Sequence, residues 1–151
     1  MLTISRSLFD KMTRHLEAGY PYEACGILIG EVDDPTHPNH RLVRDVVLVA
    51  NAWEAVSARE SRRNRYLISP DEYVKADREA SRRGLDIVGV FHSHPDHPSQ
   101  PSEMDRRQAW PGISYLIVSV RGGKATTAQA WLLRNERDAF EEESLVISDE
   151  R

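Results

Sequence analysis

The sequence contains very little cysteine. Cys25 is the only one in 151 residues, so no disulfide can form within the chain and zinc sites built from several cysteines are excluded. The shortage also excludes a zinc deaminase, whose signature includes a Pro-Cys-x-x-Cys motif. We interpret Cys25 as a small buried hydrophobic residue and not as a nucleophile, because no separate base is evident for it.

Long hydrophobic runs are also missing. No apolar stretch approaches the roughly 18 residues that span a bilayer, and residues 1–6 lack the apolar core of a signal peptide. We therefore expect a cytoplasmic protein without a membrane partner. The net charge of −4 gives no general attraction to nucleic acid. No repeat is present, and the length and the 40% hydrophobic content suit one domain over residues 1–151.

The most informative stretch is residues 87–105. An apolar, β-branched run from Ile87 to Phe91 is typical of a central strand, and His92 and His94 prolong it. Side chains of a strand repeat with period two, so both imidazoles point to the same side, roughly 7 Å apart along the backbone. This spacing suits two ligands of one metal ion.

Prolines at 95, 98 and 101 then end the strand, because proline cannot continue the hydrogen-bonded ladder. Ser102 and Asp105 follow at i and i+3, which places them on one face of a helix. Alone, this pair is typical of a helix N-cap with an acidic first turn. Two histidines, one carboxylate and an open fourth position together predict a catalytic zinc site.

This arrangement resembles the signature of a known family. His-x-His-Pro, six further residues and Ser-x-x-Asp form the motif of the JAMM (MPN+) zinc metallopeptidases, which stands unbroken here as His92, His94, Pro95, Ser102 and Asp105. The resemblance implies that the two histidines and Asp105 bind zinc and that Ser102 steadies the scissile carbonyl or its oxyanion. It also implies an upstream glutamate that activates water.

Glu23 matches the place of that glutamate. Taken alone, it is one of many carboxylates, most of which are simply solvated. It precedes a strand expected at residues 25–31, and Glu23 and Gly26 form the Glu-x-x-Gly context that resembles the family's. The resemblance therefore extends from Glu23 to Asp105 and implies that Glu23 is the general base.

His97 is a rival for the third ligand position. The spacing of His94 and His97 also suits two ligands of one metal ion. Pro95 and Pro98 constrain the turn between them, and the family motif selects Asp105. We therefore predict Asp105 as the ligand.

Alternating helices and strands are predicted along the chain. Helices are expected from a cap at Ser5 or Ser7 to about residue 19, from Ser69 to Gly84, and after Ser102 to about residue 109. Strands are expected at residues 2–4, 25–31, 41–50, 66–68, 87–94, 113–120 and 125–133, with a loop at 31–40. The acidic stretch 136–143, followed by residues 145–147, is expected to form a last strand with a frayed end. This pattern supports an α/β class. The resemblance implies a single-domain MPN/JAMM (cytidine-deaminase-like) fold, with a mixed, curved central sheet flanked by helices.

The resemblance also implies a function. The short path from Asp105 to the next strand leaves no room for the long insertion of some eukaryotic members that cut ubiquitin chains, which favours a minimal, prokaryotic-type enzyme. Such an enzyme would be a zinc-dependent metallopeptidase or isopeptidase that cleaves the bond after the C-terminal tail of a ubiquitin-like or sulfur-carrier protein. A strand edge beside the metal would pair with the tail, and a narrow slot would favour small residues.

Two points stay open at this stage. A zinc-bearing, non-catalytic MPN interaction module is the alternative function, although members that have lost activity would be expected to lack some of the ligands or the glutamate, and all four residues are present. The sequence does not give the oligomeric state, so a homodimer stays open.

Overall fold

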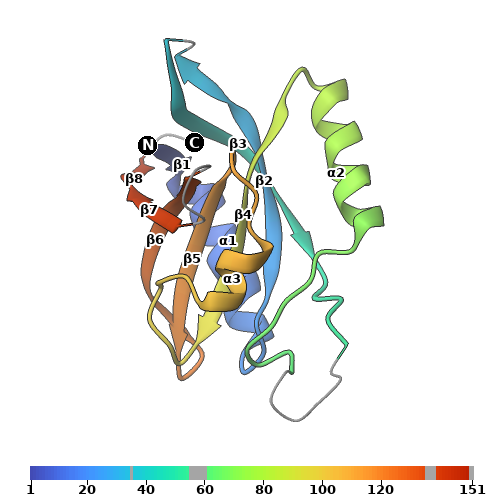
Figure 1. The fold of residues 1–151 in the computed structure, drawn as a ribbon, viewed down its shortest axis with the longest axis vertical. Helices are drawn as coiled ribbons and strands as arrows, with labels where there is room; N and C mark the ends of the chain where they lie inside the picture. The colour runs from blue at the N-terminus through green and yellow to red at the C-terminus, as the bar shows by residue number, and fades with distance from the viewer. Residues whose placement is uncertain (35, 55–60, 135–138, 150–151) are drawn as a thin grey trace.

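The structure is a computed structural model that describes residues 1–34, 36–54, 61–134 and 139–149. Figure 1 shows its helices and strands along the chain. They are β1 (Leu2–Ser5), α1 (Arg6–Gly19), β2 (Cys25–Asp34), β3 (His37–Val49), α2 (Pro70–Arg82), β4 (Asp86–Pro95), α3 (Glu103–Gln108), β5 (Ser114–Arg121), β6 (Lys124–Arg134), β7 (Ala139–Glu143) and β8 (Leu145–Ser148). Among the described residues, no helix is long and apolar enough to cross a membrane.

One mixed sheet contains all of these strands, in the order β7-β6-β5-β4-β2-β3-β1-β8. Strand β4 pairs antiparallel with β2 and parallel with β5, so both of its edges are occupied. The apolar run that leads into His92 is therefore a central strand, as its composition predicted. Its carboxyl end carries the two histidines.

The sheet is strongly curved. Strands β7 and β8 lie at opposite ends of the strand order, yet Ser144 alone separates them in the chain. The Ser144 carbonyl accepts a hydrogen bond from the Leu2 N–H at 2.8 Å, which holds this junction against β1. Because one residue joins the two edge strands, the edges converge there (Figure 1) and the sheet coils, in agreement with the expected curvature.

A helix covers each face of the sheet, and Figure 1 shows β2 and β4 passing between α1 and α2. Helix α1 buries Met12 and Leu16 in the larger hydrophobic cluster, and α2 packs Ala76 and Ala80 on a smaller cluster that includes alternate residues of β2. Ser5 caps α1, and Ser69 caps α2 by accepting from the Glu72 N–H. The two predicted helix starts are thus confirmed.

Gly26 lets β2 lie close to its neighbours. A Cβ atom at this position would lie 2.1 Å from the Phe91 ring and 2.5 Å from the Val47 carbonyl oxygen, so only glycine fits without displacing them. The pairing places Cys25 opposite His92. The glycine of the Glu-x-x-Gly context therefore brings the segment that begins at Glu23 next to the two histidines.

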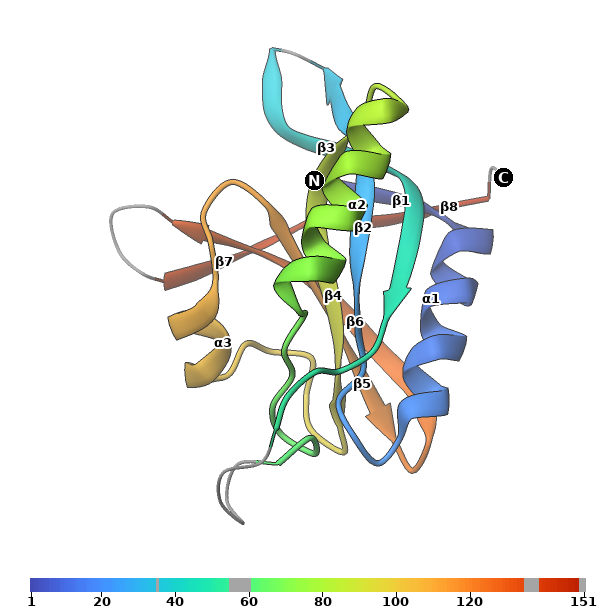
Figure 2. The ribbon, with the colours of Figure 1, turned by 90° about the vertical axis from the view of Figure 1, so that its right-hand side faces the viewer.

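The prediction of a loop at residues 31–40 is wrong. Strand β2 continues to Asp34 and β3 begins at His37, and these two residues pair across the hairpin. The hairpin projects past the rest of the sheet (Figures 1 and 2), and its side chains Val32 and Asn39 are exposed. A strand that needs no buried face keeps a polar sequence, which resembles a loop.

Two further predictions of strands need correction. Residues 66–68 join no strand ladder; instead the Leu67 N–H donates to Asn51 Oδ1 and the Leu67 carbonyl accepts from the Ala52 N–H. The acidic stretch and residues 145–147 were expected to form one last strand, but they form two, β7 on the edge of β6 and β8 on β1. In both cases partners far away in the sequence decide the outcome.

Candidate active site

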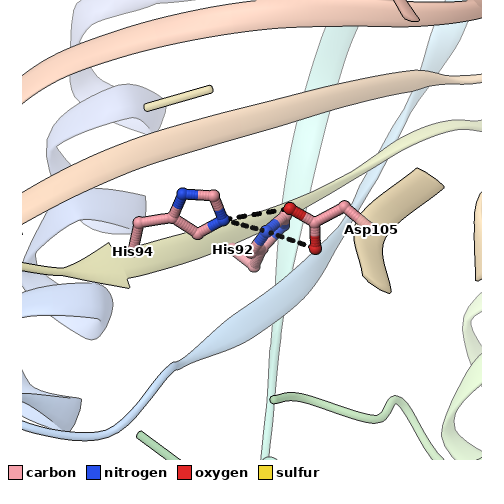
Figure 3. A group of neighbouring side chains, drawn as sticks. All are labelled: His92, His94 and Asp105. Carbon is pink, nitrogen blue, oxygen red and sulfur yellow. Dashed lines mark hydrogen bonds and ion pairs between the residues drawn. The ribbon is translucent and has the colours of Figure 1, made fainter. Parts of the chain in front are cut away.

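Strand β4 and helix α3 bring three metal-binding side chains together, as Figure 3 shows for His92, His94 and Asp105. The Nε2 atoms of the two histidines are 3.1 Å apart. Asp105 Oδ2 lies 3.0 Å from His94 Nε2, and Asp105 Oδ1 lies 3.3 Å from His92 Nε2. One carboxylate thus faces both imidazoles, as the period-two spacing and the following helix predicted.

The tautomer of His94 is set by the loop after β4. Its Nδ1–H donates to the Pro98 carbonyl at 2.8 Å, so the lone pair of Nε2 points into the cluster. A second hydrogen bond of this kind is the usual way in which proteins orient a histidine ligand. The proline-rich loop therefore does more than end the strand: it aims the His94 ring.

His92 is held differently. Its ring is fully buried and stacks on Tyr66, with ring centroids 4.3 Å apart and an interplanar angle of 23°. Among the described residues its Nδ1 atom has no hydrogen-bond partner. Two imidazole nitrogens and a carboxylate that converge within 4.8 Å in this way fit a metal ion, because a cation satisfies all three donor atoms at once.

The charges of the cluster favour a cation. Burial alone would raise the pKa of Asp105, but the two imidazoles outweigh it and hold this pKa below its usual range. Burial lowers the pKa of His92. For His94, burial is the largest single influence and acts in the same direction, but the hydrogen bond and charge of Asp105, with Glu23 and the Pro98 carbonyl, together outweigh it and raise the pKa. A proton on His94 competes with a metal ion for Nε2, so metal binding should weaken as the pH falls.

Ser102 and Asp105 form a capping box. The Ser102 Oγ accepts from the Asp105 N–H at 3.0 Å, and the Ser102 N–H donates to Asp105 Oδ2 at 2.8 Å. The same Oδ2 faces His94. The helix-cap interpretation and the metal-ligand interpretation of this pair therefore hold together, because the cap fixes the carboxylate that completes the cluster.

Glu23 lines a pocket of about 370 Å³ together with His94 and Ser102. The glutamate is only 7% exposed. Burial raises the pKa of its carboxyl group to about 8, against a lowering contribution from His94. A carboxyl group that titrates near neutral pH is suited to accept and return a proton.

His97 and Cys25 lie near the site but are not among its converging donor atoms. His97 is exposed and lines the same pocket as Glu23, yet the converging donor group contains Asp105 in its place. Its carbonyl accepts a hydrogen bond from the Ser119 hydroxyl at 2.6 Å. Burial, with a contribution from Glu23, raises the pKa of the Cys25 thiol to about 12, so it stays protonated at neutral pH.

The sequence analysis missed two residues that help to build the site. Tyr66 stacks on His92, and Asn51 bonds to the backbone of Glu23. Neither residue belongs to a recognisable motif. An Asn that follows an apolar strand, as Asn51 follows β3, is typical of a turn, and this pattern carries no signal of a role at the site.

Comparison with known proteins decides the family. The family model of prokaryotic homologs of the JAB domain matches residues 5–134. The chain belongs to this family. The predicted family and the α/β fold class with a mixed, curved sheet are therefore confirmed.

Individual JAB-domain relatives are similar over most of the chain. The desampylase of Haloferax volcanii is 32% identical over 151 aligned residues, which cover 97% of this chain and 96% of the relative. A probable TtuB-protein conjugate cleaving protease of Thermus thermophilus is 28% identical, with 83% and 74% covered. A solved structure of a Desulfitobacterium hafniense protein has a TM-score of 0.81 and 29% identity, over 99% of this chain and 94% of that one. With relatives of this kind, the JAB-domain protein is a hydrolase of the JAMM type.

Proposed function

We propose that this JAB-domain protein is a zinc-dependent peptidase or isopeptidase that cleaves the bond after the C-terminal tail of a ubiquitin-like or sulfur-carrier protein. One observation carries the proposal: His92, His94 and Asp105 converge beside a pocket that is also lined by Glu23 and Ser102. The names of the Haloferax and Thermus relatives support the choice of substrate.

Zinc is the ion that the donor set suits best. Two histidines and one carboxylate are a common protein contribution to a catalytic zinc site, which keeps one position open. Bound zinc supplies Lewis-acid chemistry, because it polarises a carbonyl group and lowers the pKa of water toward about 7.

Glu23 and Ser102 would then carry out the proton transfer and the charge stabilisation. Glu23, with its raised pKa, would take the proton of the attacking water and return it to the leaving amine. The Ser102 oxygen already accepts from the Asp105 N–H, so its own O–H is available to donate to the oxyanion. The side chains that line one pocket thus have complementary tasks.

The tail would lie along residues 65–68. We expected an exposed strand edge beside the metal, but β4 is paired on both sides and offers none. Residues 65–69 belong to no helix or strand, and both backbone groups of Leu67 bond to residues 51 and 52. We propose that an extended tail pairs with the backbone groups of Tyr66 and Ile68.

An apolar pocket of about 430 Å³ adjoins this segment. Tyr66, Val90 and Trp110 contribute to its lining, and the Trp110 side chain is 72% exposed. Val90 precedes His92 by two residues, a rise of roughly 7 Å along the strand. We infer that a tail with small residues at the cleaved bond places an apolar side chain here, a few residues before the bond.

Incubation of the zinc-loaded protein with ubiquitin-like proteins that carry a C-terminal extension tests the proposal. Mass spectrometry should show loss of the extension after the tail, and the loss should be absent with the metal-stripped protein. Cleavage of unrelated unfolded peptides at comparable rates would make the protein a general peptidase and contradict the proposed substrate. Absence of any turnover would favour the zinc-bearing interaction module.

A further inference from the structure

We propose that Asn51 is a positioning residue that holds the general base and the stacking partner of a metal ligand in one fixed arrangement. Asn51 follows β3 and lies between the segment of Glu23 and residues 65–67. It does not line the pocket of Glu23 and His94, so it would act through other residues. The catalytic consequence of this inference rests on the proposed function.

The two amide hydrogens of Asn51 join two distant parts of the chain. Nδ2 donates to the Glu23 carbonyl at 2.9 Å and to the Arg65 carbonyl at 3.0 Å. These carbonyls precede β2 and α2 respectively, and neither belongs to the regular strand pairing. The side chain of Asn51 therefore sets the distance between the backbone of the general base and residues 65–67.

The amide oxygen of Asn51 completes the arrangement. Oδ1 accepts from the Trp53 N–H at 3.0 Å and from the Leu67 N–H at 3.1 Å. An asparagine side chain offers two donors and two acceptor positions, so all four are used here. Aspartate would lose both donors and alanine would lose the whole set.

Tyr66 is held from both sides by this amide. The Arg65 carbonyl, just before Tyr66, accepts a hydrogen bond from the Asn51 amide. The Leu67 N–H, just after Tyr66, donates a hydrogen bond to the same amide. The Tyr66 ring stacks on the fully buried His92. One side chain therefore connects the base, through its carbonyl, with the aromatic ring that covers a metal ligand.

Neighbouring backbone bonds keep these segments together without Asn51. The Glu23 N–H donates to the Arg62 carbonyl at 2.5 Å, and the Ala52 N–H donates to the Leu67 carbonyl at 2.9 Å. The fold should therefore survive the loss of the amide. What is lost is accurate placement, and a displacement of about 1 Å at a reacting group can lower a rate by about 10²-fold.

The test compares Asn51→Asp and Asn51→Ala with the wild type, each zinc-loaded and each also combined with Glu23→Gln. We expect kcat to fall by about 10-fold to 10²-fold in both single variants, with KM and zinc affinity changed by less than about 3-fold. In the Glu23→Gln background the same substitutions should change kcat by less than about 3-fold, because the base they position is gone. Asn39→Asp, at an exposed position of β3, is the matched control and should behave as wild type.

A second readout does not depend on turnover. Hydrogen exchange of the Trp53 and Leu67 amides should accelerate in both Asn51 variants, because these N–H groups lose their acceptor or its geometry, while amides in the middle of β4 stay protected.

Unchanged exchange at both positions would overturn the inference. So would an equal fall of kcat in the presence and absence of Glu23, or a loss of zinc binding that accounts for the fall. If the wild type cleaved no tail, the proposed function would fail, and the exchange measurement would still decide whether Asn51 holds these segments.

Discussion

Asp105 combines two tasks in one carboxylate. Its Oδ2 accepts from the Ser102 N–H within the capping box and faces Nε2 of His94, while Oδ1 faces His92. The local helix start therefore orients the group that completes the metal site. His97, although near in sequence, is exposed and does not belong to the converging donor group.

Substitution of Asp105 by alanine should abolish stoichiometric zinc binding. It removes one of three protein ligands and leaves the two buried imidazoles without their anion. The purified wild type should contain about one zinc per chain by metal analysis. The matched variant His97→Ala should keep full occupancy; occupancy retained in Asp105→Ala and lost in His97→Ala would transfer the ligand role to His97.

At the scale of residues, the sequence predicted those site residues that lie two or three positions apart within one element. His92 and His94 share a face because strand side chains alternate, and Ser102 and Asp105 meet because a helix start brings i and i+3 together. Glu23 could be named only through the family motif. Tyr66 and Asn51 contact the site from residues that are distant in sequence, and nothing in their local pattern marks them.

At the scale of elements, the loop between β4 and α3 is anchored to β6, the second strand from β4 in the sheet. The Ser99 hydroxyl is buried, donates to Gln129 Oε1 at 2.7 Å and lies 3.0 Å from Thr127 Oγ1. The Ser99 carbonyl accepts from Trp131 Nε1 at 3.1 Å. This anchor fixes the adjacent Pro98 carbonyl, which orients the His94 ring.

Ser99→Ala should therefore affect stability and metal binding together. Loss of a buried hydroxyl that leaves Gln129 without its donor should lower the free energy of unfolding by about 1–3 kcal/mol, measured by denaturant titration. Zinc affinity, measured by competition with a chelator, should fall by about 10-fold or more, because the partner of a ligand histidine becomes mobile. The control Ser81→Ala lies at an exposed position of α2. Unchanged zinc affinity in Ser99→Ala would show that the loop does not orient His94.

Elements were predictable where burial leaves a mark on the sequence. Helices α1 and α2 show the helical period of apolar residues, and the central strands β4 and β5 are continuous apolar runs buried on both faces, so these elements were expected within a few residues. The projecting part of the β2–β3 hairpin is polar in sequence and β7 is acidic and mostly exposed, so neither shows such a mark. Their pairing depends on partners elsewhere in the sheet.

At the scale of the whole molecule, the site exists only because the sheet order places three segments side by side. Strand β2 pairs with β4, which brings Glu23 next to the histidines, and α3 returns across the end of β4 with Asp105 (Figure 3). The segment before α2 completes the site, because Asn64 and Arg65 line the pocket of Glu23 and Tyr66 stacks on His92. Composition and spacing indicated an α/β chain, but this juxtaposition required the family resemblance or the structure.

The most direct test of the account measures zinc content and turnover in the same samples of wild type and Glu23→Gln. This substitution keeps the shape of the side chain and removes the base, while the three zinc ligands stay intact. We predict about one zinc per chain in both proteins and, on a tail-extended ubiquitin-like protein, a rate that is lower by about 10²-fold to 10⁴-fold in Glu23→Gln. A zinc-loaded Glu23→Gln protein that cleaves at the wild-type rate would contradict the account.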